Sequence, residues 1–436
     1  MSIQEFYLMN QDEKVLRFEA SMNEYHVVDF VEKERYEAPL PIGYYHIHAF
    51  LKGRQAPKKR MHIESLLQNY GCNDLLGFVR LTHALSLNDT YWVKEVGSLL
   101  SWSDVSLYLH PFDEVIAQSA FEGGFATCVD PAASPEFGTD GTFPKCWVRE
   151  EDKISLYKAG SVYMGLEPYS EFYSAQLAKA IGPEMVHYDL DMYRGKLISK
   201  CNLFTDENMG YVPYHKINPN VVSMKEMVRD FEVIGSGDAF RRMVILDALI
   251  FNTDRHLGNF GFLVDNQTQK IVRMAPVFDH NQALLPYAKD KHLASLSSYL
   301  PSRVPVLGDD FNTFANAMLT PEIKRDLLNL HGFTFKRHEK FNLPEERLQI
   351  LEKIINRQIG NIIKNHTVAL GKWDLEEEFD YSKEFEELRR VEAMASLIEE
   401  DSKKEKKVTL AERLKGIGKK KAVSHECKDK GIEKEF

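Results

Sequence analysis

The sequence predicts an α+β fold of two lobes, in which a β-rich lobe containing one helix precedes a mainly helical lobe. Three observations support this prediction. Segments before residue 206 often show the two-residue period of strands, whereas apolar residues after it mostly recur every three or four positions. A short hairpin pattern over 259–285 interrupts the helical region early. The regular strand–helix alternation of a doubly wound parallel sheet is absent.

Length and composition narrow the class of protein. The 436 residues are enough for two or three domains, and 44% apolar with 28% charged residues is typical of a globular chain. No apolar run reaches the roughly 18 residues of a membrane span. Five scattered cysteines without a CxxC pair argue against a disulfide framework or a zinc site. A net charge of −10 disfavours direct nucleic-acid binding, and the start lacks a signal-peptide pattern, so we expect a cytoplasmic protein.

The first 122 residues are expected to form an α+β domain that serves as an accessory or docking module. Alternating residues predict strands over 14–20 and 24–32, and residues 60–71 predict a helix that ends at Gly71. Asn88-Asp89 predicts a turn before a strand that begins at Thr90, because these residues favour turns and the following ones favour strands. We expect this turn and strand to belong to a core, with a docking surface as the alternative.

Residues 123–205 are expected to form a β-rich lobe. A loop rich in Pro, Ser and Gly (130–145) precedes a predicted hairpin over 146–161. The helix predicted from Glu167 stops at Gly182-Pro183, and a second hairpin turns at Arg194-Gly195.

The rest of the chain is expected to form a helical lobe over 206–370 and a charged tail over 371–436. Helices are predicted over 237–251, 309–319, 320–330 and 344–366. In the tail, an acidic stretch precedes a basic one, which predicts a solvated helix and a flexible end, with a partner-binding tail as the alternative.

One polar stretch, "NTDRHLGNFGFL" (252–263), lies between two apolar segments. Polar groups there must be hydrogen-bonded, bind a metal or carry out chemistry, because burying them unpaired costs a few kcal/mol. The hairpin that follows brings its two ends together, so Asn259 and Asp279 can be neighbours, with Asp254 on the adjoining loop. Such oxygens suit Mg²⁺, and one acid held off the metal can accept a proton from a hydroxyl. The alternative is a hydrogen-bonded turn.

The first lobe supplies groups that phosphoryl transfer requires. Gly138 and Gly141 lie on a loop before a hairpin, where backbone can approach phosphates closely. Lys158 ends a predicted strand and can pair with nucleotide phosphates, with Glu171 on the next helix to hold it in place. Glu167 lies nearer the start of that helix and is expected to act as a cap.

The segment Asn-Thr-Asp-x-His-x-x-Asn, followed by an Asp after a strand, resembles the catalytic segment of the HipA-like serine/threonine kinases over roughly residues 125–365. The resemblance implies a bilobal protein-kinase-like fold, ATP and Mg²⁺. It assigns the catalytic base to Asp254, the metal to Asn259 and Asp279, and a bracing role within the catalytic group to His256. The further implied site residues are Asn252 in the catalytic segment, Lys145 and Lys158 for ATP, and Lys200, Cys201 and Asn202 in the hinge between the lobes, whose backbone groups would meet adenine. His280-Asn281 departs from the family pattern, in which Gly is more usual.

The function expected from this resemblance is transfer of the γ-phosphoryl of ATP to a protein Ser or Thr hydroxyl, as in toxin–antitoxin regulators. The implied partners are a protein substrate and a small helix-turn-helix protein of antitoxin type, without a membrane. Two alternatives stay open. Phosphoinositide kinases share an Asp-Arg-His-x-x-Asn loop, and a nucleotide-binding regulator could bind ATP without turnover.

Overall fold

The computed structural model describes residues 3–22, 27–57, 62, 67, 70, 74–123, 134–368 and 379–395. The chain divides into two compact units, Met1–Glu378 and Phe379–Phe436. In the second unit, residues 382–395 form a helix. The helix predicted over 60–71 and the basic end of the tail lie outside the described residues, apart from three isolated positions in the former. Among the described residues, no helix is long and apolar enough to cross a membrane.

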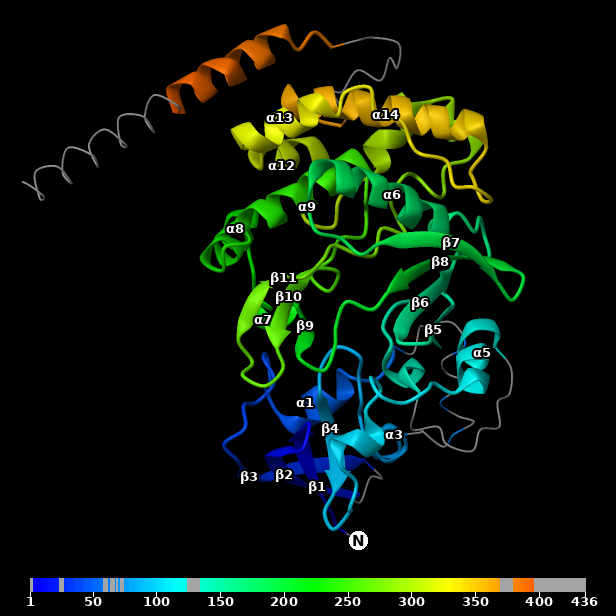
Figure 1. Ribbon diagram of the computed structural model, residues 1–436, viewed down its shortest axis with the longest axis vertical. Helices are drawn as coiled ribbons and strands as arrows, with labels where there is room; N and C mark the ends of the chain where they lie inside the picture. Colours follow the sequence, from blue (N-terminus) through cyan, green and yellow to red (C-terminus); the bar gives the residue numbers. More distant parts are fainter. Residues whose placement is uncertain are drawn as a thin grey trace, which may run out of the picture. The chain divides into compact units, whose positions relative to one another are not determined.

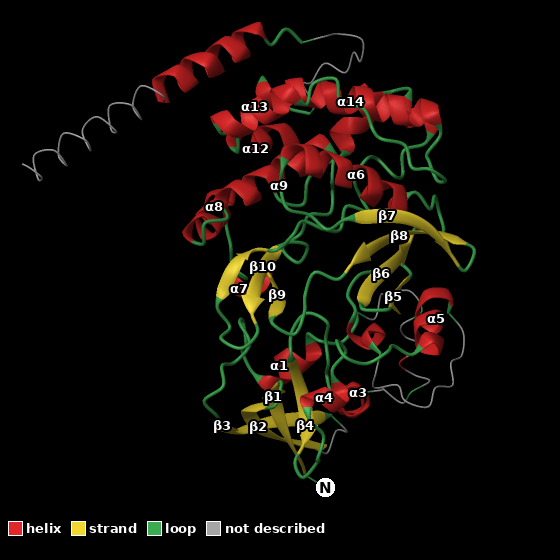
Figure 2. Cartoon of the chain, viewed as in Figure 1, coloured by secondary structure: helices red, strands yellow, loops and turns green. Residues whose placement is uncertain are grey.

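The first sheet is antiparallel. It contains the strands predicted over 14–20 and from Thr90, it contains the strand predicted over 24–32 at Val28–Arg35, and it adds a first strand, Gln4–Asn10, which was not predicted. Its order is β3-β2-β1-β4. Its strands are β1 (Gln4–Asn10), β2 (Glu13–Met22), β3 (Val28–Arg35) and β4 (Tyr91–Glu95). The helices of this region are α1 (Ile47–Lys52), α3 (Leu75–Thr82), α4 (Trp102–Val105) and α5 (Glu114–Glu122). Alternate residues of β1 and β2, such as Leu8 and Phe18, are fully buried in one core with Phe78 of α3. Figures 1 and 2 show this sheet beside the remaining sheets.

The second sheet carries the groups expected to bind ATP. Its antiparallel order is β5-β6-β8-β7, and the short 3₁₀ helix η2 (Pro135–Gly138) precedes it. The strands are β5 (Lys145–Glu150), β6 (Lys153–Ala159), β7 (Tyr188–Tyr193) and β8 (Lys196–Asn202), with α6 (Glu167–Ile181) between β6 and β7. Both predicted hairpins and the predicted helix are confirmed. Gly182, with a left-handed φ of +87°, ends α6 as expected.

The third sheet, β11-β10-β9, lies at the start of the helical part. It contains β9 (Met209–Pro213), β10 (Gly261–Asp265) and β11 (Ile271–Met274). The helices and short helical turns are α7 (Tyr214–Ile217), α8 (Met224–Val233), α9 (Gly237–Leu249), α10 (Asp290–Leu293), α11 (Leu296–Tyr299), η3 (Leu300–Ser302), α12 (Phe311–Ala317), α13 (Pro321–Asn329) and α14 (Glu345–Ile363). The predicted hairpin and the four predicted helices are confirmed. β9, α7, α8, α10, α11 and η3 are additions to the prediction.

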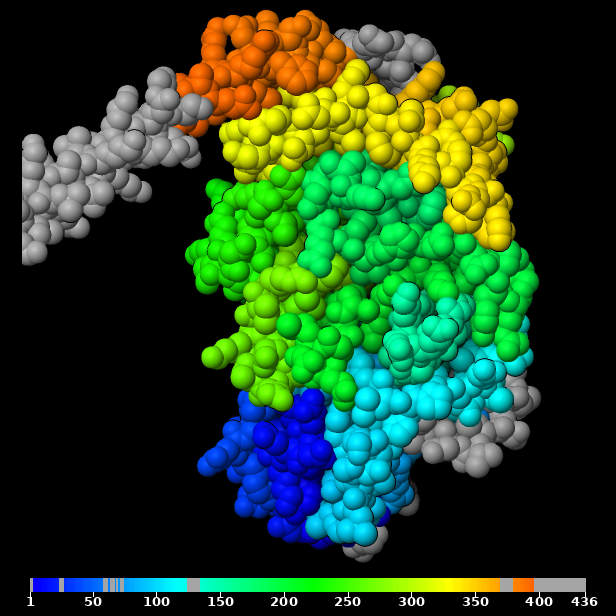
Figure 3. All heavy atoms as spheres, viewed as in Figure 1, coloured from blue at the N-terminus to red at the C-terminus, as the bar shows by residue number. Residues whose placement is uncertain are grey.

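Bonds between distant segments join the first sheet to the third. Asn10 Nδ2 donates to Asn266 O at 2.7 Å, and the Ile42 amide donates to Gln269 Oε1 at 3.2 Å. Both acceptors lie in or just after the turn of the β10–β11 hairpin. Figure 3 shows the corresponding surfaces in direct contact, with the first residues in blue and the hairpin region in yellow-green.

Candidate functional site

A cavity of about 530 Å³ lies between the second and third sheets. This volume falls within the range of small-ligand sites, about 300–1,000 Å³. Its lining combines four parts of the chain: the loop that contains Gly138 and Gly141 (the Gly-rich loop), the β5–β6–β8 face, the predicted catalytic segment (252–259) and the end of the β10–β11 hairpin. The predicted site residues that line it are Gly138, Gly141, Lys145, Lys158, Glu171, Cys201, Asn202, Asp254, His256, Asn259 and Asp279.

The register of the second sheet decides which side chains face this cavity. Lys145, Lys158 and Ser199 are direct partners across β5, β6 and β8, so their side chains share one face. Two positions along β8, Cys201 lies on the same face. Lys200 lies between them on the opposite face, where its ammonium donates to Glu150 Oε2 at 2.6 Å. Lys200 is not among the described residues that line the cavity, whereas its neighbours Cys201 and Asn202 are.

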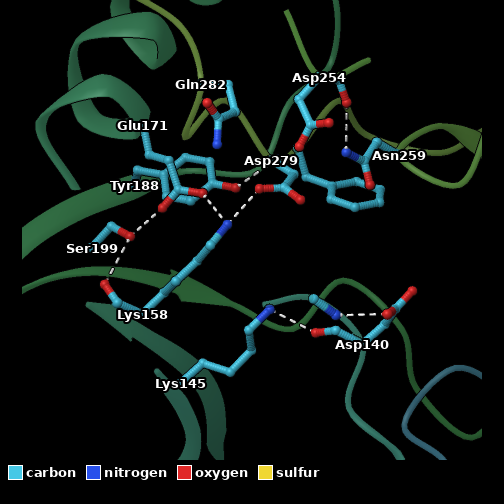
Figure 4. A network of polar contacts seen from close by, with 12 residues as sticks. Asp140, Lys145, Lys158, Glu171, Tyr188, Ser199, Asp254, Asn259, Asp279 and Gln282 are labelled. Carbon is cyan, nitrogen blue, oxygen red and sulfur yellow. Dashed lines mark hydrogen bonds and ion pairs between the residues drawn. The ribbon is translucent and has the colours of Figure 1, made fainter. Parts of the chain in front are cut away.

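Lys158 joins the two sides of the cavity (Figure 4). Its ammonium donates to Glu171 Oε1 at 2.8 Å and also to Asp279 Oδ1, which lies after the β10–β11 hairpin. Ser199 Oγ donates to the second oxygen of Glu171. Glu167 does not take part in this network. It accepts from the Ser161 amide at 3.0 Å and from the Tyr287 hydroxyl at 2.8 Å.

The charges of this network shift the acidities of its members. Burial works against the ionised form of Asp279, but the ammonium of Lys158 outweighs it and holds the pKa of Asp279 well below its usual range. Burial also opposes the charge on Lys158, yet the carboxylates of Asp279 and Glu171 raise its pKa above the ordinary value. Burial raises the pKa of Glu171, although Lys158 opposes this shift. At neutral pH, Lys158 and Asp279 are therefore held in their charged forms.

The catalytic segment is a hydrogen-bonded loop in which Asp254 lies close to Asn259. Asn259 Nδ2 donates to the Asp254 carbonyl at 3.0 Å, which fixes the carboxamide beside the acid (Figure 4). Burial, followed by the negative charge of Asp279, raises the pKa of the Asp254 carboxyl above its ordinary value. Nδ1 of His256 accepts from the Gly258 amide at 3.0 Å, which braces the loop.

Asn252 lies behind the loop. It is fully buried, its Oδ1 accepts from the Asp254 amide at 3.2 Å, and its Nδ2 donates to Asp247 Oδ1 at 2.8 Å. It is not among the described residues that line the cavity. The structure therefore places Asn252 where it can position Asp254 but cannot contact a ligand in the cavity.

Arg255 also lies behind the loop, and no role was predicted for it. Its guanidinium is buried against Asp247, with Nε–Oδ2 and Nη2–Oδ1 distances of 2.8 and 3.0 Å. Its Nη1 donates to the carbonyls of Asn259 at 2.8 Å and Phe278 at 2.6 Å. One side chain thus holds together the loop of Asp254 and the backbone before Asp279. The sequence signal was an Arg inside an otherwise catalytic segment.

The Gly-rich loop approaches Lys145 closely. The Lys145 ammonium donates to the Asp140 carbonyl at 2.6 Å. Gly141 has a left-handed φ of +98°, and a Cβ there would lie 1.9 Å from Lys145 Nζ. Only glycine therefore allows this loop and this ammonium to occupy their present positions.

We expect Gly141→Ala to displace Lys145 and to weaken ATP binding, besides a strain of about 1–2 kcal/mol from the left-handed backbone. Gly195→Ala is the matched control, because Gly195 has φ +73° with no atom within 4 Å of the added carbon. Isothermal titration with an ATP analogue and thermal unfolding check both variants. Equal effects of the two variants on nucleotide affinity would contradict this interpretation of Gly141.

Part of the cavity wall comes from the N-terminal region, which the sequence did not indicate. Ser86, Leu87 and Asn88 line the cavity. The Leu87 carbonyl accepts from Thr205 Oγ1 at 2.5 Å, and the Asn88 carbonyl accepts from the Tyr211 amide at 2.7 Å. The segment expected to be a turn before a strand thus also closes one end of the cavity.

The donor set of the cavity fits a hard divalent cation. Asp279 and Asn259 face the cavity together with Asp254, and Oδ1 of Asn281, another lining residue, is buried without a hydrogen-bond partner among the described residues. Asp279 adopts a left-handed φ of +59°, a conformation concentrated at functional sites. Mg²⁺ usually takes one or two carboxylates and completes its shell with water and substrate phosphates, so these residues suffice.

Comparison with known proteins gives a sequence relative and several similar solved structures, two of which are described below. No family model matches the sequence. The chain is 23% identical over 244 residues to the serine/threonine-protein kinase CtkA of Helicobacter pylori (strain J99 / ATCC 700824), covering 49% of this chain and 73% of CtkA. The crystal structure of a Helicobacter pylori proinflammatory kinase CtkA covers 52% of this chain and 92% of its own, with 18% identity and a TM-score of 0.38. The structure of a Shewanella oneidensis MR-1 toxin–antitoxin complex of HipA, HipB and operator DNA also matches. The match covers 82% of this chain and 97% of the other chain, with 13% identity and a TM-score of 0.48.

Proposed function

We propose, from the similarity of this chain to the serine/threonine-protein kinase CtkA and from the resemblance of residues 252–279 to the HipA-like kinases, that it transfers the γ-phosphoryl of ATP to a Ser or Thr hydroxyl of a protein. One observation carries the proposal. Lys158, paired with Glu171, reaches Asp279 across a cavity that Asp254 and Asn259 also line. Phosphoryl transfer needs this combination of a phosphate-binding cation, metal-binding oxygens and a proton acceptor.

The apolar part of the cavity suits the base of the nucleotide. Leu156, Val186, Tyr211 and Phe278 line it, together with Leu203 and Phe204 from the segment between β8 and β9. The polar part suits the phosphates, because Lys145, Lys158 and the loop at Gly138–Gly141 converge there. We infer that the ATP phosphates lie over the β5–β6 face and point toward the catalytic segment.

In the proposed reaction, the acceptor oxygen attacks the γ-phosphorus of ATP and the bond to the β-phosphate oxygen breaks, which releases ADP. Asp254 orients the hydroxyl and takes up its proton. Asn259 and Asp279 would hold Mg²⁺, which when bound neutralises negative charge on the phosphates. Lys158 would contact the phosphates, and Glu171 keeps its ammonium in place. Arg255 positions the loop through the Asn259 and Phe278 carbonyls.

The resemblance to the HipA-like kinases also supports two wider proposals. We propose that this protein is cytoplasmic and that it binds a small helix-turn-helix protein of antitoxin type. A gene for such a protein directly upstream, and co-purification of its product with this chain, would support the pairing. A purified pair that stays separate in size-exclusion chromatography would contradict it.

Asp279→Asn is expected to weaken metal binding by about tenfold or more, because a neutral amide replaces a charged oxygen ligand. Electron paramagnetic resonance of Mn²⁺ titrated into protein saturated with an ATP analogue measures this affinity directly. Asp152→Asn is the matched control, since Asp152 lies exposed in the β5–β6 turn. An unchanged Mn²⁺ affinity in Asp279→Asn would contradict the metal assignment.

The acceptor class is tested by offering protein and lipid in parallel. Wild-type protein is incubated with Mg²⁺ and γ-labelled ATP, with a cell lysate in one sample and phosphoinositide vesicles in the other. We expect label on protein, recovered as phosphoserine or phosphothreonine. Label confined to lipid would replace the proposal by a lipid kinase, and ATP binding without any transfer would favour a nucleotide-binding regulator.

A further inference from the structure

Phe137 belongs to the Gly-rich loop by sequence but to the N-terminal core by packing. It lies in η2, immediately before Gly138, and is 1% exposed. Its ring packs in the same buried cluster as Phe18, Phe78 and Ala56 of the N-terminal region. A loop that serves only as a turn would not bury a large aromatic side chain in a neighbouring core. The buried side chain of Phe137 therefore attaches the loop to the core of the N-terminal region.

Backbone contacts add to this anchor. The Ala56 amide donates to the Phe137 carbonyl at 2.8 Å. A Cβ on Gly138 would lie 3.0 Å from the Arg54 carbonyl, so the loop runs closely along this segment. Arg54 is itself fixed, because its two terminal nitrogens bond Asp89 at 2.8 and 2.9 Å. The segment on which the loop rests is therefore tied by this ion pair to the turn before β4.

The other side of the loop is bound to the second sheet. Glu136 Oε1 accepts from the Trp147 amide of β5 at 2.7 Å. The Trp147 indole donates to Thr139 Oγ1 at 2.9 Å, and this hydroxyl donates to the Pro135 carbonyl at 2.8 Å. The loop is thus held between β5 and the N-terminal core, and Phe137 supplies the buried side chain on the N-terminal side.

We propose that Phe137 is a positioning residue for the nucleotide phosphates, and that the N-terminal domain is thereby a structural part of the nucleotide site. This inference rests on the proposed ATP site. Pro135, Gly138, Thr139, Asp140 and Gly141 line the cavity opposite Lys158. With Phe137 buried, the loop is ordered before the nucleotide binds. The free energy of binding is then not reduced by the entropy lost on ordering the loop.

The phosphates, and not the base, depend on this loop. The wall expected to meet the base is built from apolar residues that do not belong to the buried cluster of Phe137, namely Leu156, Val186, Leu203, Phe204, Tyr211 and Phe278. Releasing Phe137 should therefore lower the affinity for ATP far more than the affinity for AMP. The ratio of the two dissociation constants separates loss of the loop position from general damage to the site.

The test uses the full-length protein and four forms: wild type, Phe137→Ala, Phe137→Leu and Phe18→Ala. Phe18 is the matched control, because it is fully buried in the same cluster but lies in β2, away from the loop. Calorimetric titrations with Mg²⁺ and the β,γ-imido analogue of ATP, and separately with AMP, give the two dissociation constants. Thermal unfolding of each form shows that it is folded and how far Tm falls.

We expect Phe137→Ala to lower the affinity for the ATP analogue by on the order of tenfold to a hundredfold, as a misplaced binding group does. AMP affinity should remain nearly unchanged, Phe137→Leu should recover most of the loss, and Phe18→Ala should lower Tm without changing the ratio. The inference is overturned if folded Phe137→Ala and Phe137→Leu both bind the analogue like wild type, or if Phe18→Ala changes the ratio equally. A wild type that binds neither nucleotide would overturn the proposed function itself, and this is seen before any variant is compared.

Discussion

Asp254→Asn is expected to lower kcat for phosphoryl transfer by about 10²- to 10⁴-fold, the usual contribution of a positioned general base. An amide of the same shape cannot take up the proton of the attacking hydroxyl. The ATP affinity should change little, because the contacts that hold the loop use the Asp254 backbone: its amide donates to Asn252 and its carbonyl accepts from Asn259. Steady-state kinetics with a fixed protein acceptor, together with calorimetric titration of an ATP analogue, measures both quantities.

The control for this variant is Asp152→Asn, which makes the same chemical change at an exposed turn. It should leave kcat and nucleotide affinity at their wild-type values. If Asp254→Asn kept the wild-type kcat while binding the analogue normally, Asp254 would not be the base and the assignment of the loop would be wrong.

Arg255→Met is expected to cost about 3–5 kcal/mol in the free energy of unfolding, because it leaves a buried carboxylate without its cation. Arg255 is 3% exposed and Asp247 is 6% exposed, so water cannot replace the lost partner. The Asn259 and Phe278 carbonyls lose their donor as well. Denaturant unfolding measures the stability, and the activity of the folded fraction should fall, because both sides of the catalytic centre are released.

Two further variants separate the contribution of the ion pair to stability from the contribution of side-chain packing. Arg241→Met removes a guanidinium that bonds Glu232, whose carboxylate is half-exposed, and should cost only about 0–1 kcal/mol. Asp247→Asn in combination with Arg255→Met removes the buried charge and should recover part of the stability. A loss in Arg255→Met no larger than that in Arg241→Met would show that the buried pair does not hold the loop.

The parts of the site that lie on short stretches of chain were predictable from the sequence. Asp254 and Asn259 are five residues apart, and a hairpin must return the chain close to its start, which brings Asp279 near them. Lys158 and Glu171 follow from a strand next to a helix, and the structure joins them at 2.8 Å. Local sequence patterns are enough to predict that two residues are neighbours when a short turn determines the direction of the chain between them.

The parts that depend on contacts between distant segments were not predictable. β9 is short and contains Gly210 and Pro213, so only its pairing with β10 makes it a strand. The cavity wall at Leu87 and the burial of Phe137 arise where the N-terminal region meets both lobes. For α8 a signal existed, since Ser223 caps the helix and the apolar residues Met227 and Phe231 lie four apart.

The side chains of β8 follow the two-residue period of a strand, whereas the hinge prediction concerns backbone groups, which do not depend on the face to which a side chain points. Successive side chains of a strand point to opposite faces, so Lys200 and Cys201 cannot both face the cavity from the middle of β8. The register puts Ser199 and Cys201 on the cavity face and Lys200 opposite Tyr157 on the other. Ser199, which donates to Glu171, lines the cavity and was not predicted as a site residue, and Asn202 at the end of β8 lines the cavity as well.

The most direct test of the central claim compares α-labelled and γ-labelled ATP in the same reaction. Wild-type protein is mixed with Mg²⁺, a cell lysate and one or the other nucleotide, and the label on protein is followed with and without a chelator. Phosphoryl transfer predicts label from the γ position alone, on Ser or Thr, and its loss when the chelator is present. Equal labelling from both positions, or no labelling by protein that demonstrably binds ATP, would contradict the claim that this cavity is the active site of a kinase.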